Sequence, residues 1–344
     1  MAELGIKGLS IDRVTKRFGE QTVVDALSLE IKPGEFVALL GPSGCGKTTM
    51  LRMLAGFETV NEGSIQLGSH TLASAEIHVP PEQRNMAMVF QSYALWPHMS
   101  VADNVGYPVK LRGLRGAAYQ QKVQQALALV ELEAYAERMP QALSGGQRQR
   151  VALARCLVSD PSVVLLDEPL ANLDRHLRAT MEHSFRDFHR RTGATLVYVT
   201  HDQNEAMALA DKIAVMKAGQ LVQWGAPDTL YRQPRTAWVA GFIGQGSKLL
   251  VAAGSPGKIL ESDALMRGLN AIKSERSQHV LVRPEHIQIS TKAPSNNQIA
   301  AQVKNVIFRG ERYELSLQLP SGEALLAYHH TAPDVGSHVA VSLH

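Results

Sequence analysis

The sequence predicts an α/β fold over residues 1–240, followed by a small all-β domain over residues 241–344. Three observations support this prediction. A glycine-rich run at 41–46 lies between a strand-like and a helix-like segment, and such segments alternate again over 161–240. From about residue 241 helical stretches become rare, and short β-like runs are separated by turn signals.

The glycine-rich run matches a phosphate-binding loop, with the letters Gly41-Pro42-Ser43-Gly44-Cys45-Gly46-Lys47-Thr48 followed by Thr49. The apolar run 35–40 before it predicts a buried strand, and residues 47–55 have helical spacing without Gly or Pro. Glycines let backbone N–H groups turn toward phosphate oxygens, and the helix N-terminus adds partial positive charge. We expect Lys47 to reach the β- and γ-phosphates and the Thr48 hydroxyl to bind Mg²⁺.

Two adjacent carboxylates follow a second apolar run. Residues 163–166 predict a buried parallel strand, which ends at Asp167 and Glu168. We expect Asp167 to belong to the Mg²⁺ shell and Glu168 to polarise the attacking water as a general base. An acidic turn after a core strand is the alternative, and the intact phosphate loop argues against it.

Two polar residues close further strand-like runs. Gln91 follows residues 88–90, and His201 follows residues 195–200. Taken singly, neither residue indicates a function, because the chain has 13 His and a polar residue at a strand end is ordinary. Their position within the order of motifs indicates a functional role for both residues.

Two more runs complete that order, namely Leu143-Ser144-Gly145-Gly146-Gln147 and Ala171-Asn172-Leu173-Asp174. In this order and approximate spacing, the motifs resemble those of ABC transporter nucleotide-binding subunits, over about residues 6–242. The resemblance implies a P-loop NTPase domain with a RecA-like core and an antiparallel β subdomain. It also implies an α-helical subdomain over about residues 92–160 that carries the signature run 143–147.

The resemblance implies roles for residues within one chain. Phe18 would stack on adenine through its π-face, and Gln91 would contact Mg²⁺. His201 would hold the γ-phosphate and orient the attacking water. The implied activity is ATP hydrolysis, with ATP and Mg²⁺ as cofactors.

Other implied roles require a second copy of the chain. Ser144 and Gly146 of the signature would contact the γ-phosphate that the opposite subunit binds, and Asp174 would help to align the two sites. The expected assembly is therefore a homodimer.

The segment 91–105 resembles the corresponding part of ferric-iron, polyamine, phosphonate and sulfate importer ATPases, and the sequence as a whole most resembles the ferric-iron group. In those proteins it neighbours the groove that takes a helix of the membrane subunit. Exposed Tyr93 and Trp96 would anchor such a helix, with Met99 beside them. A packed loop is the alternative. The implied partners are two membrane-spanning permease subunits and, indirectly, an extracytoplasmic solute-binding protein.

The C-terminal residues predict a small barrel. Its β-like runs are 279–282, 287–289, 301–303, 313–317, 324–327 and 339–341. The stretch Val282-Arg283-Pro284-Glu285-His286-Ile287 resembles the OB-like (TOBE-type) regulatory domain of binding-protein-dependent importers. Its histidines show no regular metal-ligand spacing, which favours solvated surface side chains.

Composition narrows the function further. A formal net charge of +3 without a basic block gives no indication of nucleic-acid binding. Cys45 and Cys156 have no metal-ligand spacing and are expected to be reduced thiols. Because no 18-residue apolar stretch or N-terminal signal region occurs, we expect the chain by itself to be cytosolic. The resemblance to importer ATPases implies a peripheral position at the cytoplasmic face of the inner membrane, where other chains supply the membrane path.

Two other classes of function remain open. A non-transport ABC ATPase would carry two cassettes in one chain, as in translation factors, or a long coiled coil, as in chromosome-maintenance proteins. This chain has one cassette and no sustained heptads. A regulatory ATPase without transport partners would instead use the C-terminal domain as a sensor.

Overall fold

The computed structural model describes residues 8–171, 175–251, 278–291, 294 and 298–343. The chain divides into two compact units, Met1–Pro234 and Arg235–His344. The boundary expected at 240/241 falls within the short helix α8 (Ala237–Phe242), which belongs to the second unit. Within the described residues, no helix combines the length and apolar character needed to cross a bilayer.

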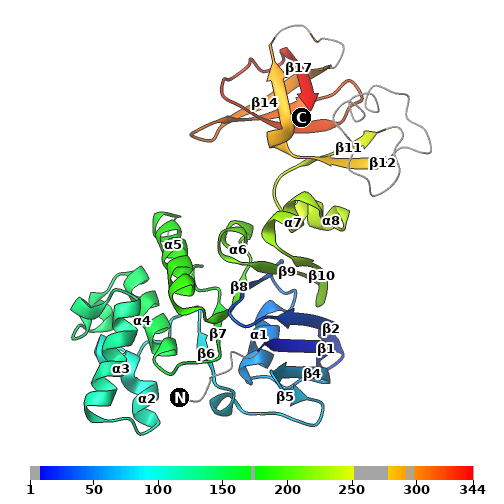
Figure 1. The fold of residues 1–344 in the computed structure, drawn as a ribbon. Helices are drawn as coiled ribbons and strands as arrows, with labels where there is room; N and C mark the ends of the chain where they lie inside the picture. Colours follow the sequence, from blue (N-terminus) through cyan, green and yellow to red (C-terminus); the bar gives the residue numbers. More distant parts are fainter. Residues whose placement is uncertain (1–7, 172–174, 252–277, 292–293, 295–297, 344) are drawn as a thin grey trace. The chain divides into compact units, whose positions relative to one another are not determined.

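A six-stranded sheet with the order β10-β9-β3-β8-β7-β6 forms the centre of the first unit (Figure 1). Its strands are β3 (Phe36–Leu40), β6 (Met86–Val89), β7 (Val163–Asp167), β8 (Thr195–Thr200), β9 (Lys212–Lys217) and β10 (Gln220–Gly225). All neighbouring pairs are parallel except β9 with β10. Every residue of β3 and β8 is buried, as expected for parallel strands covered on both faces.

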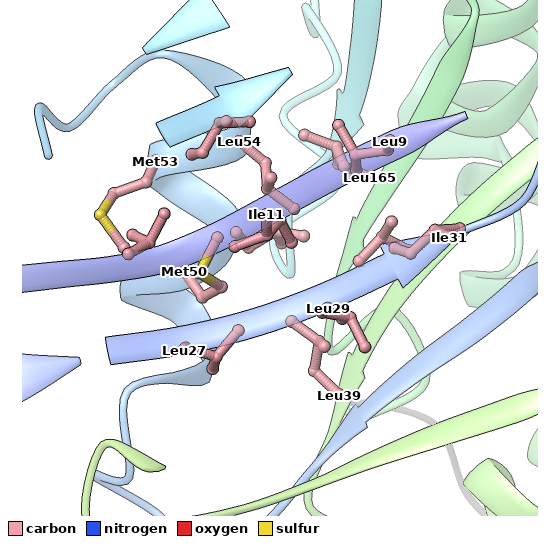
Figure 2. Close-up of a cluster of buried hydrophobic side chains, with 14 of the residues drawn as sticks. Leu9, Ile11, Leu27, Leu29, Ile31, Leu39, Met50, Met53, Leu54 and Leu165 are labelled. Carbon is pink, nitrogen blue, oxygen red and sulfur yellow. The ribbon is translucent and has the colours of Figure 1, made fainter. Parts of the chain in front are cut away.

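A second, antiparallel sheet has the order β2-β1-β4-β5. Its strands are β1 (Leu9–Phe18), β2 (Gln21–Ile31), β4 (Glu62–Leu67) and β5 (His70–Ser74). Helix α1 (Lys47–Ala55) joins the two sheets through one apolar core. In Figure 2, Met50 of α1 lies among side chains of β1, β2 and β3, including Leu27 and Leu39. Each such buried side chain contributes about 1.5–3 kcal/mol of apolar transfer free energy.

Arg84 holds the end of α1 in place. Its guanidinium donates to the carbonyl oxygens of Met53 at 2.6 Å and Leu54 at 2.9 Å, in the last turn of α1. It also donates to the carbonyls of Val79 at 2.6 Å and Leu72 at 3.2 Å. Burial lowers the pKa of Arg84 to about 10. The partial negative charge of a helix C-terminus stabilises this buried cation.

Three helices form a separate group beside β6 (Figure 1). They are α2 (Val101–Leu111), α3 (Gly116–Leu129) and α4 (Gly145–Leu157), with 3₁₀ turns at Glu133–Tyr135 and Pro140–Ala142. The first helix begins only at Val101, because Ser100 caps it by accepting from the Asp103 N–H at 3.1 Å. Residues 91–100 therefore form a loop ahead of the helices.

The other helices among the described residues of the first unit are α5 (Arg175–Thr192), α6 (Gln203–Leu209) and α7 (Pro227–Arg232), with a 3₁₀ turn at Pro81–Gln83. The strands expected at 35–40, 163–166 and 195–200 and the helix expected at 47–55 are present, with ends within one residue of those expected. The helical subdomain expected from about residue 92 has its first helix only from Val101. The pattern did not predict α5, because its charged residues obscure the buried face that Met181, Phe185 and Phe188 supply.

The described residues of the second unit are all-β apart from α8 and a 3₁₀ turn at Pro284–His286. Its strands are β11 (Ser247–Val251), β12 (Gln278–Val282), β13 (Ile287–Ser290), β14 (Ile299–Phe308), β15 (Tyr313–Gln318), β16 (Ala324–His329) and β17 (His338–Leu343). β11 pairs with β12, and the others form an antiparallel sheet in the order β13-β17-β14-β15-β16. Its outer strands β13 and β16 contact each other, so the sheet curls around its own core. The predicted OB-like domain is confirmed.

Candidate nucleotide-hydrolysis site

Parallel pairing brings the predicted site residues to one edge of the central sheet. In the observed register Leu40 pairs with Thr200, and Asp167 pairs with Val199. The phosphate loop after β3, His201 after β8 and Glu168 after β7 therefore emerge side by side. Gln91 follows β6, the next strand of the same sheet. Ligand sites of open α/β sheets lie at this carboxyl edge.

The phosphate loop requires its glycines for steric reasons. A Cβ on Gly41 would lie 2.3 Å from the Met216 carbonyl oxygen. A Cβ on Gly46 would lie 2.5 Å from the Val23 carbonyl oxygen, and Gly46 has a φ of +99° as the N-cap of α1. The backbone thus turns tightly into the start of the helix, where N–H groups can meet an anion.

Lys47 is held on this loop. Its ammonium group donates to the carbonyl oxygens of Gly41 at 2.7 Å and Pro42 at 2.9 Å, and the residue is 5% exposed. Lys47 follows the loop in the sequence and its ammonium is bound to the first two carbonyls of the loop, so it provides a fixed positive charge where phosphates would bind.

Thr48 and Asp167 meet across the loop. The Thr48 hydroxyl donates to Asp167 Oδ1 at 3.3 Å. Burial raises the pKa of Asp167, which makes its ionised form costly without a nearby cation. Hard oxygen donors of this kind fit Mg²⁺. The described residues contain no group of three or more acidic, His or Cys side chains that would enclose a metal.

Glu168 and His201 are in contact. His201 Nδ1 lies 3.2 Å from Glu168 Oε2, with the imidazole 54% exposed and the carboxylate 23% exposed. Glu168 has a φ of 44°, a left-handed conformation that is unusual for a side chain other than glycine. Its N–H donates to the Val199 carbonyl at 3.0 Å, which fixes this bend at the strand end. The partly exposed Glu168 carboxylate therefore faces the His201 imidazole at the carboxyl edge of the sheet.

Thr200 and Asp202, the residues on either side of His201, belong to a largely buried network that the sequence did not predict. Glu205 of α6 is 3% exposed and accepts from the hydroxyls of Tyr198 at 2.8 Å and Thr200 at 2.7 Å. Arg178 of α5 lies 3.5 Å from Glu205 and 3.2 Å from Asp202. Burial, together with the neighbouring Glu205, raises the pKa of Tyr198 well above its usual range. Glu205 follows His201 by four residues, but an acidic residue near a helix start is too common to attract attention.

The signature forms the start of α4. Ser144 is its N-cap and accepts from the Gln147 N–H at 3.3 Å, while the Gln147 side chain accepts from the Ser144 N–H at 2.9 Å. This capping box was readable in the sequence as Ser-x-x-Gln. Ser144 is exposed and Gly146 is buried. An exposed helix start is suited to bind an anion that another molecule presents.

Phe18 lies at the end of β1 and is 47% exposed. The Lys16 ammonium lies 4.8 Å from the centroid of its ring. Lys16 itself pairs with Glu58 at 3.1 Å and donates to the Thr59 hydroxyl at 3.2 Å. The exposed ring has the character expected of a surface for stacking on a base.

The expectation of exposed aromatic anchors after Gln91 is wrong for Tyr93, which is only 7% exposed. Its hydroxyl donates to the Pro169 carbonyl at 3.4 Å. Trp96 and Met99 are half-buried, because Asn104 of α2 binds the loop that contains them. The Asn104 side chain accepts from the Trp96 N–H at 2.9 Å and donates to the Trp96 and Met99 carbonyls, each at 3.1 Å. Asp174, which was expected to help align the two sites of a dimer, lies outside the described residues.

Comparison with known proteins extends these observations. Residues 24–171 match the family model described as ABC transporter, and residues 280–344 match the TOBE domain. The Fe(3+) ions import ATP-binding protein FbpC of Escherichia coli (strain K12) is 41% identical over 339 residues, covering 98% of this chain and 95% of the relative. The spermidine/putrescine import ATP-binding protein PotA of Pseudomonas aeruginosa (strain UCBPP-PA14) is 46% identical over 329 residues, covering 92% and 89%.

A sugar-system relative and a solved structure are also similar. The diacetylchitobiose uptake system ATP-binding protein MsiK of Streptomyces coelicolor is 45% identical over 292 residues, covering 82% of this chain and 76% of the relative. The solved structure is a dimeric, post-hydrolysis state of the ATP-binding cassette MJ0796 bound to ADP and Pi. It has a TM-score of 0.55 and 30% identity, and the match covers 64% of this chain and 98% of that chain.

The fold and the loop–carboxylate site define a P-loop nucleotide hydrolase. The family matches and the similarity to these relatives show that the chain belongs to the ABC transporter family, as an ATP-binding subunit of the importer type. It binds ATP and is an ATPase. The predicted fold class, family and enzymatic activity are thereby confirmed.

Proposed function

We propose that this chain hydrolyses ATP to drive uptake of ferric iron through membrane permease subunits. The observation that carries the ATPase part is the meeting of Lys47, Thr48, Asp167, Glu168 and His201 at one sheet edge. Support for ferric iron comes from the FbpC relative, which covers both units of the chain. The ATPase itself has no need to touch the cargo.

Each site residue has a task in this proposal. The loop amides and Lys47 bind the phosphates, while Thr48, Asp167 and Gln91 hold Mg²⁺. The ion would neutralise negative charge on the β- and γ-phosphates. Glu168 polarises the attacking water, and His201, 3.2 Å from that carboxylate, orients it against the γ-phosphate.

Catalysis in the proposal needs two copies of the chain. The exposed N-terminus of α4 supplies Ser144 and Gly146 to the nucleotide of the opposite subunit, and Asp174 aligns the two sites. The dimeric state of the solved cassette structure supports this arrangement. A helix of 13 residues that begins at an exposed capping serine is suited to bind a phosphate from outside the chain.

The proposed location is peripheral, on the cytoplasmic face of the inner membrane. Trp96 and Met99 remain candidates for the contact with the two permease subunits, since both keep part of their surface accessible. Tyr93 is withdrawn as a direct anchor because it is buried. An extracytoplasmic solute-binding protein would deliver the cargo to the permeases.

Polyamine uptake is the second candidate. The observation in its favour is the 46% identity to PotA, which exceeds the 41% identity to FbpC over a somewhat shorter alignment. The mechanism at the nucleotide site is the same for either cargo, so the two candidates differ only in the partner proteins.

Transport by a deletion strain tests the proposal. We expect loss of this chain to abolish uptake of radiolabelled ferric iron by the cognate system and to leave polyamine, phosphonate and sulfate uptake intact. Re-expression of the wild-type chain should restore iron uptake, whereas Glu168→Gln should not. Normal iron uptake with loss of another substrate would transfer the assignment to that substrate. If no uptake changes and no permease co-purifies, the chain is a non-transport ATPase.

A further inference from the structure

Two consecutive residues after Gln91 have a left-handed backbone. Tyr93 has a φ of 61° and Ala94 has a φ of 46°. In this region Cβ crowds the following carbonyl, so the conformation persists only where surrounding contacts hold it. The turn lies between Gln91, proposed to contact Mg²⁺, and Trp96, proposed to face the permease. The contacts that hold the turn therefore help to set the positions of both Gln91 and Trp96.

One arginine of the signature helix binds this turn. Arg155 of α4 donates from Nη1 to the Ala94 carbonyl at 2.7 Å and from Nη2 to the Tyr93 carbonyl at 2.8 Å. Its guanidinium carbon also lies 4.8 Å from the centroid of the Trp96 ring. Two parallel N–H groups on a rigid plane match two successive carbonyls, a geometry that lysine cannot reproduce. Burial lowers the pKa of Arg155, in keeping with a partly desolvated charge.

The same turn contacts the strand end that carries the carboxylates. The Tyr93 hydroxyl reaches the carbonyl of Pro169, the residue directly after Glu168. The Tyr93 N–H donates to the Phe90 carbonyl at 2.8 Å and so closes the backbone around Gln91. A single turn thus contacts the helix of the signature, the end of β7 and the strand that leads to Gln91.

We propose that Arg155 is a positioning residue that ties the turn at Tyr93 and Ala94 to α4. Gln91 and the signature run Ser144–Gln147 then shift together when the nucleotide binds. This inference rests on the proposed function, because it assigns Gln91 to the metal ion. Without Arg155 the turn relaxes and Gln91 loses its fixed place, while the phosphate loop stays intact.

The test compares two arginines of the same helix in the full-length chain. Arg150 is the matched control, because it is also half-buried on α4 and donates to the Val130 carbonyl at 3.1 Å, outside the turn. We expect Arg155→Met to lower kcat about tenfold and to raise the half-saturating Mg²⁺ concentration several-fold. Binding of trinitrophenyl-ATP without Mg²⁺ should change less than about twofold, and Arg150→Met should stay within about twofold of wild type throughout.

Backbone rescue separates positioning from simple structural support. Glycine adopts the φ of Ala94 without strain, so Ala94→Gly should hold the turn even when Arg155 is lost. The double variant Arg155→Met/Ala94→Gly should therefore regain about threefold or more in kcat over Arg155→Met. Should Arg155→Met fail to fold, Arg155→Lys serves in both comparisons, since its single nitrogen cannot donate along the same fork.

Fluorescence gives an independent readout. With Trp224→Phe and Trp238→Phe, Trp96 is the sole tryptophan of the chain. Its emission should respond to Mg-ATP, and Arg155→Met should abolish the response. An unchanged kcat and Mg²⁺ dependence, an equal loss in Arg150→Met, or a loss that Ala94→Gly cannot rescue would each overturn the role of Arg155. A wild-type chain without Mg²⁺-dependent ATPase activity would instead refute the proposed function, before any variant is compared.

Discussion

At the scale of single residues, the site places its proposed general base in an unfavourable backbone conformation. The left-handed φ of Glu168 costs about 1–2 kcal/mol for a residue with a side chain. The hydrogen bond from its N–H to Val199 and the contact with His201 hold it there. Strain at such a position is typical of a group that must be aimed at a reacting atom.

The first prediction concerns this carboxylate. Glu168→Gln keeps the shape of the side chain but removes the charge that polarises water, so kcat for Mg-ATP should fall about 100-fold or more. The affinity for ATP should change little, because Lys47 and the loop amides carry the binding. Steady-state ATPase assays and equilibrium nucleotide binding measure the two quantities. A parallel loss of affinity and turnover would show that Glu168 serves nucleotide binding instead.

At the scale of elements, the loop over residues 91–100 combines a fixed backbone with partly accessible side chains. Asn104 is fully buried and satisfies several backbone groups of this loop, while the Trp96 ring packs against Tyr107 in a tilted arrangement with centroids 4.5 Å apart. A prepared loop of this kind loses little entropy when it binds a partner. It is therefore suited to hold a helix of a membrane subunit.

The second prediction tests this contact. Trp96→Ala and Met99→Ala should each shift the chain from the membrane fraction to the soluble fraction, because anchor residues contribute about 2 kcal/mol or more. Trp96→Phe, which keeps an aromatic ring, should retain most of the membrane-bound protein. Cell fractionation with immunodetection measures the ratio. If both alanine variants stay membrane-bound and transport normally, the permease contact lies elsewhere.

At the scale of the whole molecule, each chain carries both a phosphate loop and a signature run. In the proposed dimer these two parts of one chain act on different nucleotides. The phosphate loop starts α1, and the signature starts α4 in the separate helical group (Figure 1). In a two-fold symmetric dimer the loop of each chain would face the signature run of the other, which gives two equal composite sites.

Mixing variants provides the third prediction. Lys47→Ala removes the loop function and Ser144→Arg blocks the signature, so each homodimer should be inactive. In a mixed dimer the intact loop of one chain faces the intact signature of the other. An equal mixture should therefore recover about a quarter of the wild-type rate if a single site suffices. Failure of the mixture to exceed its components would place the signature and the loop in the same chain's site.

Much of this architecture could be predicted from the sequence, because it depends on strong local signals. Apolar runs such as residues 163–166 match their strands, and the glycines of the phosphate loop are required by close backbone contacts. The order of the motifs then places the site, since every parallel strand ends at the same sheet edge.

The sequence could not predict contacts between residues that lie far apart in the chain. Tyr93 looked like an exposed anchor, but its hydroxyl finds the Pro169 carbonyl and its ring is buried. The network of Glu205 with Arg178 and the fork of Arg155 likewise depend on how separate helices pack. No period or spacing in a single sequence records such pairings.

The capping box of α4 has a consequence for the timing of the catalytic cycle. The Ser144 hydroxyl accepts from the Gln147 N–H, so in the proposed dimer it can keep this cap and donate its own hydrogen to a phosphate. One hydrogen bond to a charged group is worth only about 1.5–3 kcal/mol. The two chains would thus adhere weakly through this serine alone, and the charge of the nucleotide between them would supply most of the attraction. Departure of the terminal phosphate then suffices to let them separate, so the pair resets itself without a dedicated release step.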